Sequence, residues 1–290
     1  MNNLFSSQTR DTDDLLACSL AVIDRAFEVG ANTMLPLFSG GHDSLSACFV
    51  ASQHPRFAGM VYHIDTGIGA KATRKFVEET CREFKWTLRV YKSPFTYEMF
   101  IHKYGFPGPG GHQWVYARLK ERCIRLMTKG TEPRLLITGC RQQESKRRMG
   151  HTEPIKIGET SKKTAKVTNK KRIWTAPCHD WSGEEQRSFM NDFALPRNPV
   201  KESLLGMSGE CFCGAFARPY ELEMIQQFAP DVATEIARLE QIAKECGRVQ
   251  CRWGKRQPGE NGQVIVRTGP LCSSCDRKAA AAGVLFDDLE

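Results

Sequence analysis

The sequence of 290 residues has no apolar run near the roughly 18 to 20 residues that a membrane-spanning helix requires. Its first residues show no basic region followed by an apolar stretch, so a signal peptide is not expected. The GxxxxGK[ST] motif of P-loop proteins and the GxGxxG motif of dinucleotide-binding proteins are both absent. With 41% hydrophobic and 26% charged residues, the composition excludes collagen-like and wholly disordered chains. We therefore expect a folded, cytoplasmic protein.

Cysteine is too sparse for a disulfide scaffold, with 12 Cys in the chain, although this number is high for a cytosolic enzyme. Without a signal peptide, we expect thiols rather than structural disulfides. Cys18, Cys48 and Cys123 lie inside apolar runs, which predicts small, buried hydrophobic side chains. Later cysteines are grouped differently, in short-spaced pairs beside Gly and Pro.

The positive charge of the chain is concentrated in one segment. The formal net charge is +8. Residues 141–172 hold eleven Lys or Arg against three Glu, which gives +8, so the rest of the chain sums to zero. Such a segment is either a surface for a polyanion, meaning nucleotide phosphates or nucleic acid, or a solvated loop.

Apolar periodicity and turn residues predict strands that alternate with helices. The expected strands span residues 33–38, 59–64, 87–91, 134–138 and 173–176. The expected helices span residues 12–29, 43–51, 70–84, 94–102 and 112–127, with a further helix opened by a capping box at Ser182. This alternation predicts an α/β fold with a doubly wound, mostly parallel sheet.

The pattern changes near residue 200. Two helices are expected at residues 219–228 and 230–245, and the remainder is rich in Gly, Arg and Cys. We therefore predict a nucleotide-binding domain over residues 1–200 and a small, Cys-bearing helical module over residues 201–290.

The most informative segment is LFSGGHDS, residues 37–44, which runs from a predicted strand through Ser39-Gly40-Gly41 into a predicted helix. Two glycines allow the backbone to approach a phosphate closely, and the hydroxyls and free N–H groups of the helix start then face the anion. Ligands bind at this end of the strands in open parallel sheets. The alternative interpretation is a turn that only joins strand to helix.

Ser-Gly-Gly-x-Asp-Ser resembles the pyrophosphate loop of the PP-loop ATP pyrophosphatases, the adenine nucleotide alpha hydrolase-like superfamily. Three further segments resemble the phosphoadenosine phosphosulfate (PAPS) reductase-like branch of that superfamily. They are HIDTG at residues 63–67, GCRQQESKRR at residues 139–148 and PCHDW at residues 177–181. The resemblance covers about residues 30 to 200, with the motifs in the expected order.

The resemblance implies a set of site residues around ATP or a PAPS-like nucleotide with Mg²⁺. Asp43, Asp65 and Arg141 would be catalytic. The residues that would bind the nucleotide are Ser39, Gly40, Gly41, His42, Ser44, Gly139, Glu144, Ser145, Arg147 and Arg148. His42 departs from the family, because Lys often fills its position. The alternatives are a plain helix cap for Asp43, a strand-end turn for Asp65 and a solvated basic face for Arg147 and Arg148.

Four late cysteines form a CxC pair, Cys211 and Cys213, and a CxxC pair, Cys272 and Cys275. Four thiolates suit zinc or an iron–sulfur cluster, while redox thiols or simple turns are the alternatives. The resemblance favours a [4Fe–4S] cluster, because adenylyl-sulfate reductases and DNA phosphorothioation proteins of this branch carry clustered Cys. Cys246 and Cys251 are alternative ligands. Glu245-Cys246-Gly247 matches the start of the Glu-Cys-Gly-Leu-His tail of PAPS reductases, but Arg248 follows.

The resemblance implies an enzyme whose substrate attacks the α-phosphate of ATP and releases pyrophosphate, in sulfur transfer to a substrate such as nucleic acid, as in DNA phosphorothioation. DNA or tRNA, bound by residues 141–172, and a sulfur-donor protein are the expected partners. One alternative is a thiol-dependent PAPS or adenylyl-sulfate reductase. Another is a non-catalytic, zinc-containing nucleic-acid-binding protein.

Overall fold

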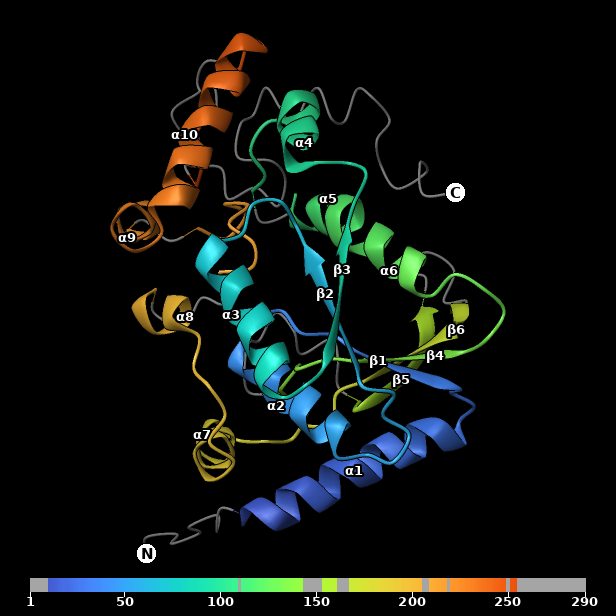
Figure 1. Cartoon of the computed structure of the whole chain (residues 1–290). Helices are drawn as coiled ribbons and strands as arrows, with labels where there is room; N and C mark the ends of the chain where they lie inside the picture. The colour runs from blue at the N-terminus through green and yellow to red at the C-terminus, as the bar shows by residue number, and fades with distance from the viewer. Residues whose placement is uncertain are drawn as a thin grey trace, which may run out of the picture. The chain divides into compact units, whose positions relative to one another are not determined.

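A computed structural model describes residues 10–108, 111–142, 153–160, 167–204, 209–217, 220–248 and 251–254. The chain divides into two compact units, each assembled from several segments (Figure 1). The first unit comprises Met1–His63, Phe76–Val90 and Thr128–Asn198. The second unit comprises Ile64–Lys75, Tyr91–Met127 and Pro199–Glu290. A domain division at residue 200 stays a prediction. None of the helices in the described ranges combines the length and the apolar character that crossing a membrane demands.

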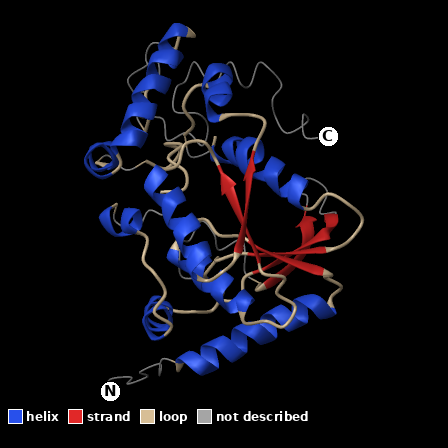
Figure 2. Ribbon diagram, viewed as in Figure 1, coloured by secondary structure: helices blue, strands red, loops and turns tan. Residues whose placement is uncertain are grey.

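The first unit is built on a four-stranded sheet with the strand order β1-β4-β6-β5. Figure 2 shows the strands of the protein in red. β1 (Thr33–Pro36), β4 (Arg134–Ile137) and β6 (Val167–Thr175) are parallel, and β5 (Ile155–Thr160) is antiparallel to β6. The predicted α/β fold with a mostly parallel sheet is therefore confirmed. β2 (Met60–Asp65) and β3 (Thr87–Lys92) form a separate two-stranded sheet.

Pro36 stands in β1 without disrupting the sheet. β1 is an edge strand of the four-stranded sheet. Beyond the proline, the Leu37 N–H donates to Ile137 O at 3.0 Å, and the Phe38 N–H donates to Tyr62 O at 2.8 Å. Backbone N–H groups alternate in direction along a strand, so the N–H that Pro36 lacks would point toward β2. Hydrogen bonding to β2 begins only two residues later, at Phe38.

Helices pack on this sheet through the apolar faces that the sequence predicts. α1 (Thr12–Glu28) and α2 (His42–Ser52) contact its strands, and α7 (Gly183–Asp192) contacts both helices. The core between them includes Phe38, Leu45, Leu135, Trp181 and Phe189, all buried. Cys48 and Cys123 are buried as predicted, but the prediction for Cys18 is wrong. Cys18 is exposed because the buried stripe of α1 runs through Leu15, Ser19 and Ile23.

The second unit has its own core, built around aromatic side chains such as Tyr97, Phe106 and Trp253. Its described helices are mostly short. They are α4 (Tyr97–Tyr104), α5 (His112–Val115), α6 (Arg122–Met127), α8 (Pro199–Ser203), α9 (Glu221–Phe228) and α10 (Pro230–Glu245). A π-helical segment, Tyr116–Glu121, joins α5 to α6, so the predicted helix 112–127 is not uniformly α-helical. α3 (Lys71–Glu83) begins in the second unit and ends in the first.

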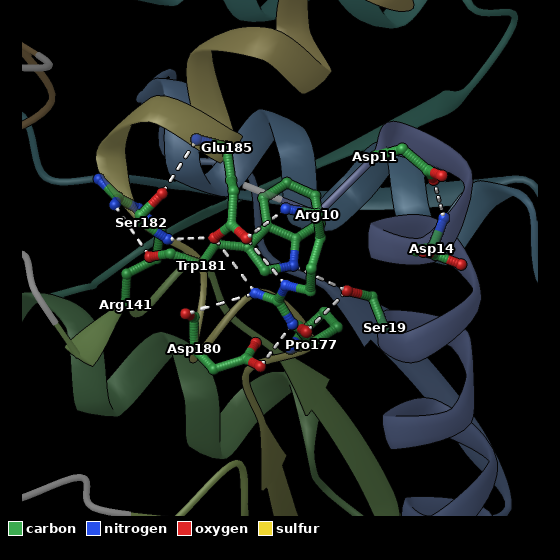
Figure 3. Close-up of polar contacts among 10 residues, drawn as sticks. All are labelled: Arg10, Asp11, Asp14, Ser19, Arg141, Pro177, Asp180, Trp181, Ser182 and Glu185. Atoms are coloured by element: carbon green, nitrogen blue, oxygen red, sulfur yellow. Dashed lines mark hydrogen bonds and ion pairs between the residues drawn. The ribbon is translucent and has the colours of Figure 1, made fainter. Parts of the chain in front are cut away.

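The start of α7 is fixed by the predicted capping box. Ser182 Oγ accepts the Glu185 N–H at 3.1 Å, and Glu185 Oε2 accepts the Ser182 N–H at 2.7 Å. Arg10 joins this box from the start of the described chain, because its Nε donates to Glu185 Oε1 at 2.8 Å and its Nη1 donates to Asp180 Oδ2 at 2.7 Å (Figure 3). The hydrogen bond from Arg10 lowers the pKa of Glu185 to about 2.

Replacing Glu185 by Gln should lower the free energy of unfolding at pH 7 by about 1 to 2 kcal/mol, since a charge-assisted hydrogen bond is lost while a Gln capping box is retained. The folded-state pKa of about 2 lies below the ordinary value of 4.5. The charge therefore stabilises fully above pH 4.5 and progressively less as the pH falls toward 2. Urea titrations at pH 7 and pH 3 should show the difference between Glu185→Gln and wild type shrinking at pH 3. Glu184→Gln, at an exposed neighbour, is the control.

Candidate nucleotide-binding site

The loop that joins β1 to α2 is closed by a network of hydroxyl groups. Ser44 Oγ donates to Gly41 O at 2.8 Å and accepts the Ser39 N–H at 3.2 Å. The hydroxyl oxygens of Ser39 and Ser44 are 3.0 Å apart, and the Gly41 N–H donates to Ser39 Oγ at 3.4 Å. Gly40 has φ +84°, a conformation that favours glycine. The loop is thereby held as a tight turn against the first turn of α2.

Gly139, which follows β4, lies directly against the start of α2. A Cβ atom built on it would be 2.3 Å from Ser44 N and 2.4 Å from Asp43 C. Because backbone atoms cannot yield as a flexible side chain can, only glycine fits here. The structure thus brings Gly139 to the residue 39–44 loop, although the two segments lie far apart in the sequence.

Asn198 supports the loop from a third segment, and no sequence motif marks this residue. Its Nδ2 donates to Gly40 O at 2.8 Å, and the residue is fully buried at 0% exposure. This hydrogen bond fixes the peptide that follows Gly40. An Asn before a Pro in a predicted loop is a common pattern, so only the folded chain shows what it contacts.

Asn198→Ala should weaken ATP binding by about tenfold and cost about 1 to 3 kcal/mol of stability, because a buried carbonyl loses its donor. Isothermal titration calorimetry and thermal unfolding measure the two effects. Asn191→Ala, near the end of α7, is the matched control and should change ATP affinity by less than about twofold, because surface substitutions rarely propagate. Unchanged ATP affinity in Asn198→Ala would show that the loop does not need this support.

Asp43 and Arg141, which belong to two different sequence motifs, form an ion pair. Arg141 Nε donates to Asp43 Oδ1. Arg141 Nη1 donates to Trp181 O at 3.4 Å (Figure 3). The two side chains are only 12% and 11% exposed. The carboxyl ends of adjacent parallel strands meet at one edge of a sheet, which explains why these residues converge.

The PCHDW segment holds Arg141 in place. Trp181 Nε1 donates to Ser19 Oγ at 3.1 Å, and Ser19 Oγ donates to Pro177 O at 2.9 Å (Figure 3). The Gln142 N–H donates to His179 O at 2.8 Å. Three of the four motifs therefore contact one another in the first unit. This edge of the sheet offers N–H groups of a helix start, hydroxyls and a guanidinium, which together suit an anion.

Other predicted residues are placed as follows. His42 is the first residue of α2 and is buried, and His63 Nδ1 is 2.8 Å from Phe38 O. Glu144, Ser145, Arg147 and Arg148 lie outside the described residues. Asp65 belongs to the second unit, where its Oδ1 accepts the Gly67 N–H at 2.9 Å and its Oδ2 is 3.3 Å from Arg74 and 3.0 Å from Lys92.

The segment after Asp65 is hydrogen-bonded to the CxC segment within the second unit. Thr66 Oγ1 donates to Glu210 O at 2.8 Å, and the Phe212 N–H donates to Ile68 O at 2.8 Å. A Cβ atom on Gly69 would be 2.6 Å from Glu210 O, so the two backbones are in close contact. The fourth motif therefore positions the first pair of predicted metal ligands.

Cys211 and Cys213 bring their sulfur atoms together. The hydrogen bond between the two side chains lowers the pKa of Cys211 to about 7, and the ammonium of Lys120 acts in the same direction. Lys120 Nζ is itself 2.9 Å from Glu210 Oε1. The same hydrogen bond, together with burial, raises the pKa of Cys213. Two adjacent sulfurs, one of which favours the thiolate, suit two ligands of one metal centre.

Cys272 and Cys275 lie outside the described residues. Within the described ranges, no group of three or more His, Cys, Asp or Glu residues is placed to hold a metal ion. The alternative ligands Cys246 and Cys251 thus do not join Cys211 and Cys213 in such a group. Cys251 is buried, and its Sγ accepts the Phe106 N–H at 3.2 Å.

Comparison with known proteins identifies the family of this chain. The family model described as the phosphoadenosine phosphosulfate reductase domain matches residues 33–203, which is more than half of the chain. The protein belongs to that family, and its predicted resemblance is confirmed. No curated protein matches the chain.

Solved structures with related folds are distant in sequence. Phosphoadenylyl-sulfate (PAPS) reductase from Candida auris, in a phosphate complex, is 17% identical, covering 66% of this chain and 89% of that chain, with a TM-score of 0.46. The U34-tRNA thiolase NcsA from Methanococcus maripaludis, with its [4Fe–4S] cluster, is 14% identical, covering 94% and 90%, with a TM-score of 0.42. FMN adenylyltransferase from Candida glabrata, with FAD and pyrophosphate, is 14% identical, covering 67% and 61%, also with a TM-score of 0.42.

Proposed function

We propose that this protein is an ATP-using enzyme whose substrate attacks the α-phosphate and releases pyrophosphate. The observation that carries the proposal is the loop of residues 39–44, closed by its own hydroxyls and pressed against Gly139. Such a loop leaves no room for a side chain where the two backbones meet, and it presents the N-terminus of α2. A site of this kind works mainly by positioning phosphates and neutralising their charge.

Each residue of the site has a distinct part in this proposal. Ser39, Gly40, Gly41 and Ser44 hold the pyrophosphate through hydroxyl and backbone N–H groups. Arg141 neutralises charge that develops on the phosphates, and Asp43 orients its guanidinium through the ion pair. His42 donates a hydrogen bond in the position that Lys often fills. Glu144, Ser145, Arg147 and Arg148 complete the phosphate contacts.

Magnesium would supply further charge neutralisation on the bound nucleotide. The carboxylates of Asp43 and Asp65 are oxygen ligands of the type that Mg²⁺ prefers. Both carboxylates are held by basic side chains, Asp43 by Arg141 and Asp65 by Arg74 and Lys92. We propose that these partners hold the two carboxylates in place when the nucleotide is absent.

We propose sulfur transfer as the use of this activation, with Cys211, Cys213, Cys272 and Cys275 holding a [4Fe–4S] cluster, or zinc as the alternative. The meeting of the Cys211 and Cys213 sulfurs and the lowered pKa of Cys211 support a thiolate–metal site. An iron–sulfur cluster would supply electron-transfer or sulfur-binding chemistry. A sulfur-donor protein is the expected partner.

We propose nucleic acid, DNA or tRNA, as the sulfur acceptor, bound by the basic segment of residues 141–172. In the described part of this segment, Lys170 and Lys171 are exposed on β6. Arg172 is buried, and its Nε donates to Thr128 Oγ1 at 3.1 Å, so this cation is structural and does not face a ligand. The segment is thus a strand pair for part of its length and not one continuous solvated loop.

Replacing Lys162, Lys163, Lys170 and Lys171 by Gln should flatten the salt dependence of nucleic-acid binding, since each lost phosphate contact removes about 0.9 released counterion. Fluorescence anisotropy with labelled single-stranded DNA and tRNA at several salt concentrations measures the slope. ATP affinity should not change. Quadruple replacement of the exposed Lys71, Lys75, Lys85 and Lys103 is the control and should leave the slope as in wild type. Equal slopes in both variants would remove nucleic acid from the proposal.

The function is tested by identifying the products of ATP. Anaerobically purified protein is incubated with α-labelled ATP, with and without DNA or tRNA and a sulfide source. AMP or an adenylated substrate with pyrophosphate is the expected result, and Ser44→Ala should abolish it while the protein stays folded. Turnover of PAPS with a thiol, but not of ATP, would instead establish the reductase alternative. Nucleic-acid binding with bound zinc and no nucleotide turnover would establish the non-catalytic alternative.

A further inference from the structure

A cysteine and a histidine meet outside the proposed ATP site, on the second unit. Cys246 Sγ is 3.0 Å from His102 Nδ1. Cys246 follows α10, and His102 lies in the last turn of α4, two helices that contact each other. The imidazole is 53% exposed and the cysteine is half-buried, so a small molecule can reach the sulfur.

A third side chain lies close to the imidazole. His102 Nε2 is 3.9 Å from Glu98 Oε1, one turn earlier on α4. Glu98 is in turn fixed by Arg238 of α10, whose Nη2 donates to Glu98 Oε2 at 2.7 Å. Nδ1 faces the thiol, and Nε2 faces the carboxylate. A nucleophile beside a base, with an acidic group on the far side of the base, is the arrangement of an activated nucleophile.

The backbone around Cys246 is built to hold the sulfur in this position. Gly247, at φ +74°, donates its N–H to Lys244 O at 2.8 Å, and the Arg248 N–H donates to Ala243 O at 2.9 Å. These two bonds form a Schellman motif, which ends α10 after Cys246. The Glu-Cys-Gly sequence therefore has a structural reason here, because glycine is favoured at the left-handed position that follows the cap.

Arg248 offsets the negative end of α10, which would otherwise oppose a thiolate. Its Nη1 donates to Cys246 O at 3.5 Å, and its Nη2 donates to Lys103 O at 2.9 Å. The guanidinium is thus fixed between the ends of α10 and α4, next to the cysteine. Cys246 therefore has the His102 imidazole beside its thiol and the fixed Arg248 guanidinium at its backbone carbonyl.

We propose that Cys246 is a reactive thiol that forms mixed disulfides with small disulfides, with His102 as its base. The thiol proton passes to His102 Nδ1 while the Cys246 sulfur attacks one sulfur of the disulfide. The old S–S bond breaks, and the leaving thiolate takes the proton from the imidazolium. One half of the small disulfide joins Cys246 in the mixed disulfide, and the other half leaves as a thiol, so atoms and electrons balance. This inference does not depend on the ATP site.

The test incubates the full-length, reduced protein with oxidised glutathione near neutral pH. Peptide mass spectrometry measures the rate of glutathione addition at each cysteine. Cys246 should acquire glutathione at least about tenfold faster than the exposed Cys18 of α1 in the same molecule, because His102 assists Cys246. Cys18 serves as the unassisted reference. His102→Gln should remove this advantage while the rate at Cys18 stays within about twofold. Met99→Gln, at an exposed position one turn earlier on α4, should leave both rates unchanged.

Equal rates at Cys246 and Cys18 in the wild-type protein would overturn the proposal, and this comparison needs no variant to fold. An unchanged rate at Cys246 in folded His102→Gln would also overturn it, because the histidine would then not act as the base. Loss of ATP turnover in any of these proteins would change neither of these two rate comparisons. The reactive thiol and the proposed enzyme activity are therefore tested separately.

Discussion

Gly139→Ala is expected to abolish detectable ATP binding. A Cβ atom at this position would be 2.3 Å from Ser44 N and 2.4 Å from Asp43 C, far inside van der Waals contact with backbone. Either β4 or the first turn of α2 must move, and both carry groups that the loop uses. We expect ATP affinity to fall by at least about a hundredfold, while overpacking costs about 1 to 3 kcal/mol of stability. Calorimetric titration and urea unfolding measure the two quantities.

Gly183→Ala is the matched control. A Cβ atom on Gly183 would meet only the end of the Arg187 side chain, at 3.5 Å, and this glycine is the first residue of α7. Stability and ATP affinity should both stay near wild type. If Gly139→Ala binds ATP as Gly183→Ala does, the close contact between Gly139 and α2 does not shape the nucleotide site.

Single Ser substitutions of Cys211, Cys213, Cys272 or Cys275 should each remove most of the bound metal. Three thiolates close a four-ligand site poorly, so metal affinity should fall by at least about tenfold in each variant. Anaerobic purification followed by metal analysis and visible absorption measures the loss, and it separates an iron–sulfur cluster from zinc.

Cys18→Ser and Cys246→Ser are the controls for this series, because the described residues place neither cysteine in a metal-holding group. Both should keep the wild-type metal content. Full metal retention in all four variants of the proposed ligands would show that these cysteines do not share one metal site. Loss in only the Cys211 and Cys213 variants would divide the cysteines into a metal pair and a separate CxxC pair.

The sequence predicted the elements that carry strong local signals. The Ser182 capping box, the helix ended by Gly30 and the strand–loop–helix of residues 33–51 all appear where their patterns place them. These features depend on residues a few positions apart, so a local pattern suffices. The nucleotide loop was predictable for the same reason, because glycines and hydroxyls cluster within six residues of chain.

Features that depend on distant segments were not predictable. The strand predicted at residues 173–176 overlaps the end of β6, but β5 and the first part of β6 were missed, because their charged residues conceal the alternation of half-exposed strands. Asn198 and the pairing of Asp43 with Arg141 come from segments far apart in the chain, and no single segment shows such contacts. Cys18 was misassigned because an apolar run does not show which face of a helix is turned inward.

A crystal structure of the protein with an ATP analogue that resists cleavage between the α- and β-phosphates would test the nucleotide site directly. We expect the pyrophosphate portion to lie against residues 39–44 at the start of α2, within hydrogen-bond distance of the Ser39 and Ser44 hydroxyls, with Arg141 facing the phosphates. Phosphates bound elsewhere on the protein, with this loop unchanged and empty, would contradict it.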